Sequence, residues 1–299
     1  MLTLPKRILF FVLTNMLVIG LMTVVCYVFG VESYMSGTGL NLPGLLIFSA
    51  LFGFLGSAVS LLLSKWMAKR GTGTVLIKTP QNPTEQWLVD TVRGLASQSN
   101  IGMPEVGIFP SPAPNAFATG WNRNNALVAV SAGLLQSMDK QEVEAVLAHE
   151  IAHVANGDMI TMALMQGVMN TFVIFLSRVI GYLVDRLVLK NERGYGLGYY
   201  ATVIVAQIAL GILANVVVMW FSRIREFRAD AGAARLRGPD AMIAALEALR
   251  RPAPTELPKS LAAFGIRGGK TGGMRALFAS HPSIDDRIAA LERFKQRSA

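Results

Sequence analysis

The segment LAHEIAHVANGD, residues 147–158, places two histidines four positions apart around a glutamate. Positions four apart lie on one face of an α-helix, with about 6 Å between their Cβ atoms, so His149 and His153 can bind a single ion. Glu150 lies about 100° further round the helix, close to the ion but off the ligand direction. This arrangement suits a zinc site in which the glutamate deprotonates the attacking water. The chain has only three histidines in 299 residues, and two of them form this pattern, which favours a metal site over chance spacing on a surface helix.

The residues before the histidines predict where this helix begins. Asp139 and Glu142 have the spacing of a capping box, in which each side chain accepts a hydrogen bond from the backbone of the other. The following residues, EVEAVLAHEIAHVANGD, continue with helical periodicity. We therefore expect one helix from Asp139 through both histidines.

A third metal ligand must come from elsewhere in the chain. In SRIREFRADAGAARL, residues 222–236, Glu226 and Asp230 are again four positions apart. Glu226 can complete a His₂Glu ligand set and leave a fourth position for water. Asp230, one turn later, can accept the free ring N–H of a liganding histidine. The segment alone is also typical of a solvated helix whose arginines pair with its acids, but beside the histidine motif we favour the ligand interpretation.

The composition indicates membrane segments, because 52% of the residues are apolar, only 16% are charged, and the mean hydropathy is +0.44. About 20 apolar residues are needed to cross the hydrocarbon core as a helix. Four runs are long enough, at 8–31, 43–63, 159–184 and 199–221. The first is too long for the apolar part of a secretory signal, so we interpret it as a retained anchor. The single cysteine, Cys26, excludes a disulfide framework and a cysteine-based zinc site.

Basic residues flank the first predicted hairpin on both outer sides, whereas its loop, residues 32–42, holds one acid and no base. The positive-inside rule then places both ends of this hairpin, and the domain after it, in the cytoplasm. These bases are Lys6, Arg7, Lys65, Lys69 and Arg70. The turn of the second hairpin, residues 185–198, carries charges of both signs and leaves open whether that hairpin crosses fully.

The net charge of +9 raises the possibility of a nucleic-acid partner. However, the bases cluster beside the membrane segments, and the sequence contains no nucleic-acid-binding motif. Attraction to anionic lipid is therefore the favoured interpretation, and no nucleic-acid partner is expected.

The fold class that these features predict is α+β, with about four transmembrane helices and a small β-sheet. A strand is expected over 74–79 and a helix over 84–99, followed by the extended segments EVGIF, NAFATG and ALVAVSAGLL. The Gly- and Pro-rich stretch after residue 250 is expected to be a mobile loop, with 265–273 as a lid over the cleft. The predicted parts are a membrane hairpin (1–66), a soluble part with the zinc helix (67–158), a second hairpin (159–221) and a second soluble part with the third-ligand helix (222–299).

The order HEIAH, then REFRAD after a membrane hairpin, then SHPSIDDRI resembles the HtpX-type membrane zinc metalloproteases. These are relatives of the CAAX prenyl endopeptidases in the wider thermolysin-like (gluzincin) group, and the resemblance covers nearly the whole chain. It implies one zinc per chain, bound by His149, His153 and Glu226, with Glu150 as general base. It also implies a bacterial inner-membrane endopeptidase, active on the cytoplasmic side, that clears misfolded or damaged membrane proteins under heat or envelope stress.

The same resemblance suggests residues that contact substrate. Thermolysin-like enzymes hold substrate as an added strand on an edge such as PNAFATG, so Asn115 and Ala116 are candidates for substrate-facing contacts. An ordinary turn and strand explains this segment almost as well. His281 is a candidate catalytic group that could hydrogen-bond the oxyanion of the tetrahedral intermediate, or it could simply cap its turn. Arg287 could also bind substrate by hydrogen-bonding this oxyanion, or it could pair with an acid.

Three other functions would share some of these features. A metal-binding transporter would need ligands inside the spans, which contain no His, Asp or Glu before Asp185. A catalytically silent chaperone would be expected to have lost Glu150 or a ligand. A CAAX-type processing protease shares the motifs, but its known members carry more than four spans. Polypeptides, especially membrane proteins, are the expected substrates, while the sequence leaves the oligomeric state open.

Overall fold

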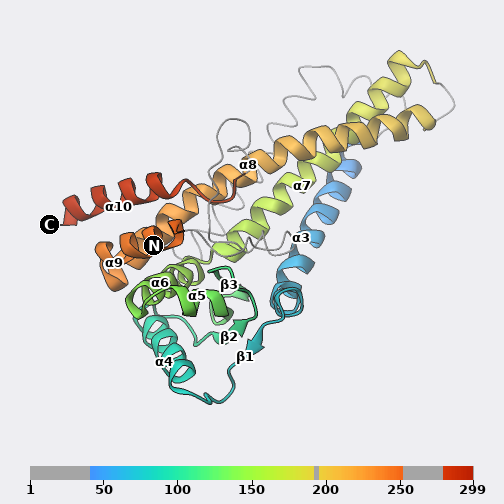
Figure 1. Ribbon diagram of the computed structural model, residues 1–299. Helices are drawn as coiled ribbons and strands as arrows, with labels where there is room; N and C mark the ends of the chain where they lie inside the picture. Colours follow the sequence, from blue (N-terminus) through green and yellow to red (C-terminus); the bar gives the residue numbers. More distant parts are fainter. Residues whose placement is uncertain (1–40, 192–194, 252–278, 299) are drawn as a thin grey trace. The chain divides into compact units, whose positions relative to one another are not determined.

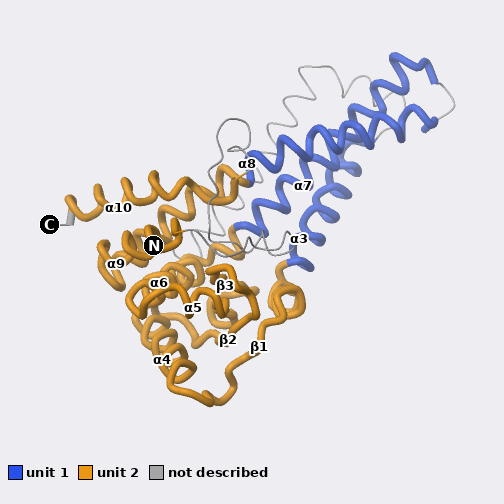
Figure 2. The backbone as a smooth tube through the Cα atoms, viewed as in Figure 1, with its two compact units in different colours: residues 1–60, 162–218 blue, residues 61–161, 219–299 orange. Residues whose placement is uncertain are grey.

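The computed structural model describes residues 41–191, 195–251 and 279–298. The chain forms two compact units, one of residues 1–60 and 162–218 and the other of residues 61–161 and 219–299 (Figure 2). The first predicted span (8–31), Cys26 and the predicted lid (265–273) lie outside the described residues.

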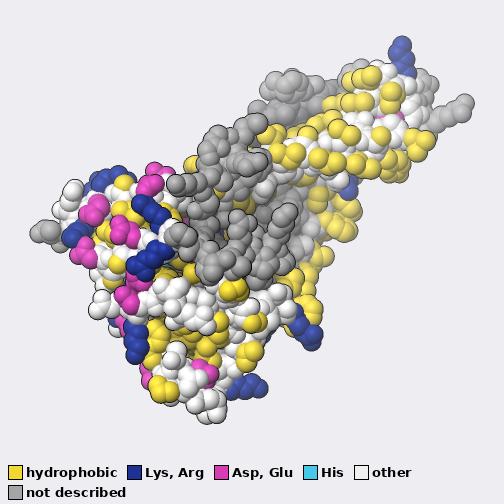
Figure 3. Space-filling view, in the orientation of Figure 1, with side chains coloured by type: hydrophobic (Ala, Val, Ile, Leu, Met, Phe, Trp, Pro, Cys, Tyr) yellow, Lys and Arg dark blue, Asp and Glu magenta, His cyan; other side chains and the backbone are white. Residues whose placement is uncertain are grey.

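Three of the described helices are long and apolar enough to cross a membrane (Figure 1). They are α3 (Leu42–Thr72), α7 (Asp158–Leu183) continued by the π-helical turn η1 (Val184–Val188), and α8 (Leu197–Arg237). A hydrocarbon core about 30 Å thick admits such segments because a helix satisfies its backbone polar groups internally. Where Figure 3 shows the described helices of the first unit, hydrophobic side chains are abundant on their surface, as expected for a surface in contact with lipid.

In the first unit, α3 and α7 approach closely at two glycines. A Cβ on Gly53 would lie 2.5 Å from Thr171 Oγ1, and one on Gly167 would lie 2.6 Å from the Phe54 ring. Small residues allow helix backbones to approach in this way inside a membrane. The GFLGSA run of α3 therefore contributes to helix packing.

The second unit contains a four-stranded sheet in the order β1-β2-β4-β3 (Figure 1). Its strands are β1 (Val75–Leu76), β2 (Glu105–Phe109), β3 (Ala116–Asn122) and β4 (Asn125–Ser131). β2 and β4 are parallel, and the other two pairs are antiparallel. Its helices besides the end of α8 are α4 (Pro83–Gln98), α5 (Ala132–Ser137), α6 (Lys140–Asn156), α9 (Pro239–Arg250) and α10 (Ile284–Ser298). The predicted α+β class, mainly helical with a small sheet, is confirmed.

One predicted element is wrong in its second half. ALVAVSAGLL is extended only as far as Ser131, after which the chain forms α5. The Ser131 hydroxyl accepts a hydrogen bond from the Leu134 backbone N–H at 3.0 Å, which caps the new helix. The small apolar residues that follow are compatible with either structure, so the serine cap decides the outcome.

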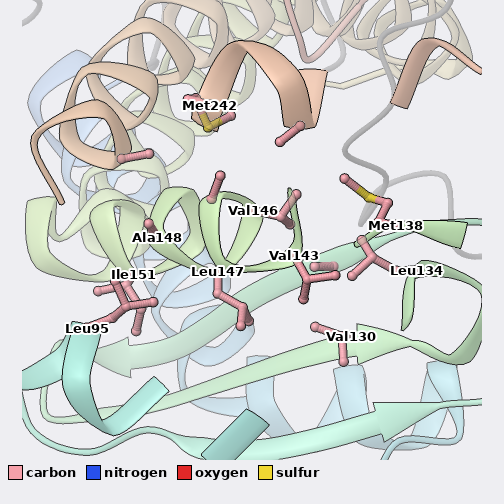
Figure 4. Packing of buried hydrophobic residues seen from close by; sticks show 14 of the residues in the cluster. Leu95, Val130, Leu134, Met138, Val143, Val146, Leu147, Ala148, Ile151 and Met242 are labelled. Atoms are coloured by element: carbon pink, nitrogen blue, oxygen red, sulfur yellow. The ribbon is translucent and has the colours of Figure 1, made fainter. Parts of the chain in front are cut away.

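The helix that carries the histidines, α6, lies between the sheet and α9 (Figure 4). Its predicted capping box is present: Asp139 accepts from the Glu142 backbone at 2.8 Å, and Glu142 accepts from the Asp139 backbone at 3.0 Å. Leu147 and Ile151 point from α6 into the buried cluster, and Met242 of α9 packs on its opposite side (Figure 4). Each such buried side chain contributes about 1.5–3 kcal/mol, so the backbone that carries the histidines is firmly held.

Candidate metal centre

The two histidines of α6 direct the same ring atom towards one point. The Nε2 atoms of His149 and His153 are 3.1 Å apart, and the two rings are nearly perpendicular at 88°. The His149 side chain is only 2% exposed. The helical spacing predicted from HEIAH therefore brings two ring nitrogens to one buried position.

Glu226 of α8 supplies the third group. Its Oε2 lies 3.5 Å from His149 Nε2, and its Oε1 lies 3.3 Å from His153 Nε2. Ligands about 2.0–2.1 Å from a tetrahedral zinc ion are separated from one another by about 3.3 Å. The two histidine nitrogens fit this value, and each Glu226 oxygen lies near one of them. One ligand atom from each of the three residues lies within 4.8 Å of the others, so the residues present fit a single metal ion with two nitrogen ligands and one carboxylate ligand.

A carboxylate lies behind each histidine. Asp230 Oδ1 is 2.9 Å from His149 Nδ1, and Asp158 Oδ2 is 2.6 Å from His153 Nδ1. Each Nδ1–H can donate to its carboxylate, which leaves the Nε2 lone pair of the same ring free for an ion. Asp230 occupies the position predicted for it. Asp158 is not among the residues predicted from the sequence, although it is the last residue of the segment 147–158 and directly follows a glycine.

These carboxylates change the protonation of both rings. Burial lowers the pKa of His153, but Glu226 and Asp158 outweigh it and raise that pKa to about 10. Burial likewise lowers the pKa of His149, and hydrogen bonds with Asp230 and Glu226 more than reverse this, so its pKa is also raised. Both shifts favour the protonated ring in metal-free protein, and an ion that binds competes with that proton.

Glu150 follows His149 on α6 and is 5% exposed. Among the described residues, no side chain or backbone group forms a hydrogen bond or ion pair with its carboxylate. A carboxylate beside a metal site is placed to accept a proton from water.

Comparisons with known proteins support the same chemistry. The model of peptidase family M48 matches residues 82–295. The chain belongs to peptidase family M48.

This M48 chain has similar relatives over almost its full length. It is 59% identical over 286 residues to the Protease HtpX homolog of Thiobacillus denitrificans, covering 96% of this chain and 98% of the relative. It is 58% identical over 287 residues to Protease HtpX of Hahella chejuensis, covering 95% and 98%. It is 55% identical over 291 residues to Protease HtpX of Pseudomonas putida, covering 96% and 99%. The M48 chain is thus a bacterial membrane metalloprotease, and the predicted HtpX-type resemblance is confirmed.

The crystal structure of Ste24p from S. mikatae has a similar fold. It aligns with a TM-score of 0.58 at 17% identity, covering 95% of this chain and 67% of the other. At this level of identity the likeness supports the architecture alone.

Two further predicted residues of the M48 chain lie next to the ligands. His281 Nδ1 is 2.6 Å from Glu226 Oε2, so its ring is already hydrogen-bonded to the third ligand. Any contact between His281 and substrate would therefore come from Nε2. Arg287 is 1% exposed and donates to Asp230 from Nε at 2.8 Å and from Nη2 at 2.6 Å. Pairing with an acid was one of the two roles predicted for Arg287, whereas substrate contact stays a prediction that would require it to leave Asp230.

The predicted edge strand is β3, which pairs with β4 and forms one edge of the sheet. The carbonyl of Asn115 accepts from the Ser131 backbone N–H at 2.8 Å, so Asn115 faces β4. Because backbone direction alternates along an antiparallel strand, the N–H and C=O groups of Ala116 and Ala118 point away from β4. Asn115 and Ala116 are buried as whole residues, at 0% and 1% exposed, whereas Ala118 is partly exposed, so among these residues only the outward backbone of Ala118 is accessible.

Proposed function

We propose that this M48 chain is a zinc-dependent endopeptidase that hydrolyses peptide bonds of misfolded or damaged membrane proteins. The observation that carries the proposal is the separation of 3.1, 3.3 and 3.5 Å among His149 Nε2, His153 Nε2 and Glu226. Two imidazoles and one carboxylate form a ligand set that suits a catalytic zinc site with one open position.

His149 and His153 would hold the ion through Nε2, and Glu226 through its carboxylate. When bound, the ion supplies a Lewis acid that polarises the peptide carbonyl and makes water a nucleophile near neutral pH. Asp230 holds the His149 ring in the tautomer that presents Nε2.

Glu150 moves the proton in this scheme. Its carboxylate accepts a proton from the attacking water and delivers it to the amine that leaves when the peptide bond breaks. The outward backbone groups of Ala118 are accessible to a substrate strand, and those of Ala116, beside Asn115 at the start of that edge, would pair with substrate once uncovered. His281 Nε2 is the nearest predicted group for the oxyanion, and donation from it requires a proton on that nitrogen.

The position of the ligands along α8 supports membrane substrates. Glu226 lies five residues, about 8 Å, beyond Phe221, the last residue of the apolar run. We propose that residues 1–66 and 159–221 form membrane hairpins and that 67–158 and 222–299 form one protease domain. The site would then lie just outside the bacterial inner membrane, on its cytoplasmic side, where chains leaving the bilayer can reach it.

Metal reconstitution of the detergent-purified protein tests the proposal. We expect metal-free protein to regain about one zinc per chain and, with it, cleavage of an unfolded membrane protein. Glu226→Gln should lose both, whereas Glu247→Gln, which changes an exposed glutamate of α9, should lose neither. Cleavage of a prenylated peptide instead of the unfolded protein would favour the CAAX-type alternative. Zinc binding without cleavage of either substrate would contradict the proposal.

A further inference from the structure

Asp158 has a contact that the predicted mechanism does not use. Its carboxylate oxygen Oδ2 lies 2.6 Å from His153 Nδ1, and the residue is 5% exposed. The other metal-binding histidine has an equivalent partner in Asp230, itself held by Arg287. Both rings are therefore supported, but from different elements of the chain.

The turn that carries Asp158 is built for this contact. α6 ends at Asn156, and Gly157 adopts the left-handed conformation with φ 68°. The Gly157 N–H donates to the carbonyls of His153 and Val154, after which α7 begins at Asp158. A left-handed glycine ends the helix and redirects the chain, and the Asp158 side chain contacts the His153 ring five residues earlier.

Arg225 fixes the same turn from the other side. Its Nη1 donates to the Asp158 carbonyl at 3.3 Å, and its Nη2 donates to Ser222 Oγ at 3.1 Å. Arg225 immediately precedes Glu226 on α8. Asp158 thus contacts the metal ligand His153 through its side chain, and through its backbone it contacts α8, the helix that carries Glu226.

We propose that Asp158 is a positioning residue of the metal site, holding the His153 ring with Nε2 towards Glu226 while Arg225 anchors the Asp158 backbone. The reason is chemical: without an acceptor at Nδ1, the ring can turn over or carry its proton on Nε2, and either change removes a metal-binding lone pair. This inference rests on the proposed metal-dependent function. It also means that the first residue of α7 supports metal binding.

The test measures zinc affinity by competition with a chelator in the full-length detergent-solubilised protein. Loss of a carboxylate behind a liganding histidine weakens metal binding by about 10–100-fold, which is the result expected for Asp158→Ala. Asp158→Asn should lose less, because its amide oxygen can still accept from Nδ1–H. The visible spectrum of the Co²⁺-substituted protein gives a second readout, and we expect it to change in Asp158→Ala and to stay closer to wild type in Asp158→Asn.

Asp139→Ala is the matched control. It removes an aspartate at the other end of α6, where the side chain caps the helix and contacts no metal ligand. Its thermal unfolding midpoint should fall while its zinc affinity stays within about twofold of wild type. The inference is overturned if Asp158→Ala keeps wild-type zinc affinity, or if Asp139→Ala loses as much affinity as Asp158→Ala. If the wild type itself binds no zinc, the proposed function fails, and that result is distinct from failure of Asp158 alone.

Discussion

Each liganding histidine uses one ring nitrogen for the ion site and the other for a carboxylate. His149 is held by Asp230 at 2.9 Å and His153 by Asp158 at 2.6 Å. The carboxylates hold both Nε2 atoms towards the same point, and they also keep protons on the rings when no ion is present.

We expect zinc binding to release protons at neutral pH. Burial lowers the pKa of His153, but Glu226 and Asp158 raise it to about 10, so this ring is protonated at pH 7.5 in metal-free protein. A zinc ion must displace that proton, and the raised pKa of His149 adds to the effect. Calorimetric titration in buffers of different ionisation enthalpy should give at least about one proton released per ion. A binding heat that does not depend on the buffer would contradict this expectation.

The same shift predicts how the stability of metal-free protein depends on pH. The folded-state pKa of His153 is raised from about 6.5 to about 10, so its stabilising contribution is complete below about pH 6.5 and is lost as the pH rises through about 10. The thermal unfolding midpoint of metal-free protein should therefore fall between these values. In His153→Gln the fall over this window should be smaller, and an equal fall in both proteins would argue against the assignment.

For single residues, the sequence predicts the roles of site residues that share one helix. It does not predict the roles of residues that only tertiary contacts bring to the site. His149, His153, Glu226 and Asp230 could be assigned because spacing of four residues on a helix implies a shared face. Arg287 and His281 could be assigned only alternatives, because each meets its partner from a position more than 50 residues away: His281 meets Glu226, and Arg287 meets Asp230. No local pattern encodes such a pairing.

Among the elements, α6 is the one that the sequence predicts best. Its start is predicted by the capping box of Asp139 and Glu142, whereas its end before Gly157 was not predicted. The strand predicted over 74–79 is shorter than expected: β1 comprises Val75 and Leu76, and one further backbone bond joins Ile77 N–H to the Val106 carbonyl. Strand propensity is local, whereas the length of a strand depends on how far its neighbour runs beside it.

The contact between α3 and α7 gives a prediction at this scale. Gly53→Val would place side-chain atoms where Thr171 Oγ1 already lies 2.5 Å from the Cβ position, so the two helices must separate. We expect a lower thermal unfolding midpoint in detergent and lower protease activity. Gly56→Val is the matched control, since nothing lies within 4 Å of its Cβ position on the same helix. Equal losses in the two variants would show that helix contact is not the cause.

For the whole molecule, the remaining question is whether the second hairpin crosses the bilayer. Arg178 lies 20 residues after the start of α7, about 30 Å along the helix, so it falls near the far end of the apolar run, away from its middle. Tyr182, Tyr195 and Tyr199 form ring contacts near the same turn, and tyrosines are enriched at the two membrane surfaces. These positions favour complete crossing, which the mixed charges of the turn could not establish from sequence.

Cysteine labelling tests this topology. In a Cys26→Ser background, Val188→Cys near the turn is 69% exposed, and Gln98→Cys at the end of α4 is also exposed. We expect a membrane-impermeant thiol reagent applied to spheroplasts to label position 188 and to reach position 98 only after lysis. Labelling of both positions only after lysis would mean that the hairpin does not cross, and labelling of position 98 from outside would place the active site on the other side of the membrane.

The central claim is that Glu150 acts as the base beside a metal held by other residues. The most direct measurement compares zinc content and cleavage of an unfolded membrane protein for wild type, Glu150→Gln and Glu144→Gln, a change on the same helix outside the site. Glu150→Gln should keep about one zinc per chain while cleavage falls by about 10²–10⁴-fold, the usual contribution of a general base. Glu144→Gln should behave as wild type. Cleavage by Glu150→Gln at the wild-type rate with zinc in place would contradict the account.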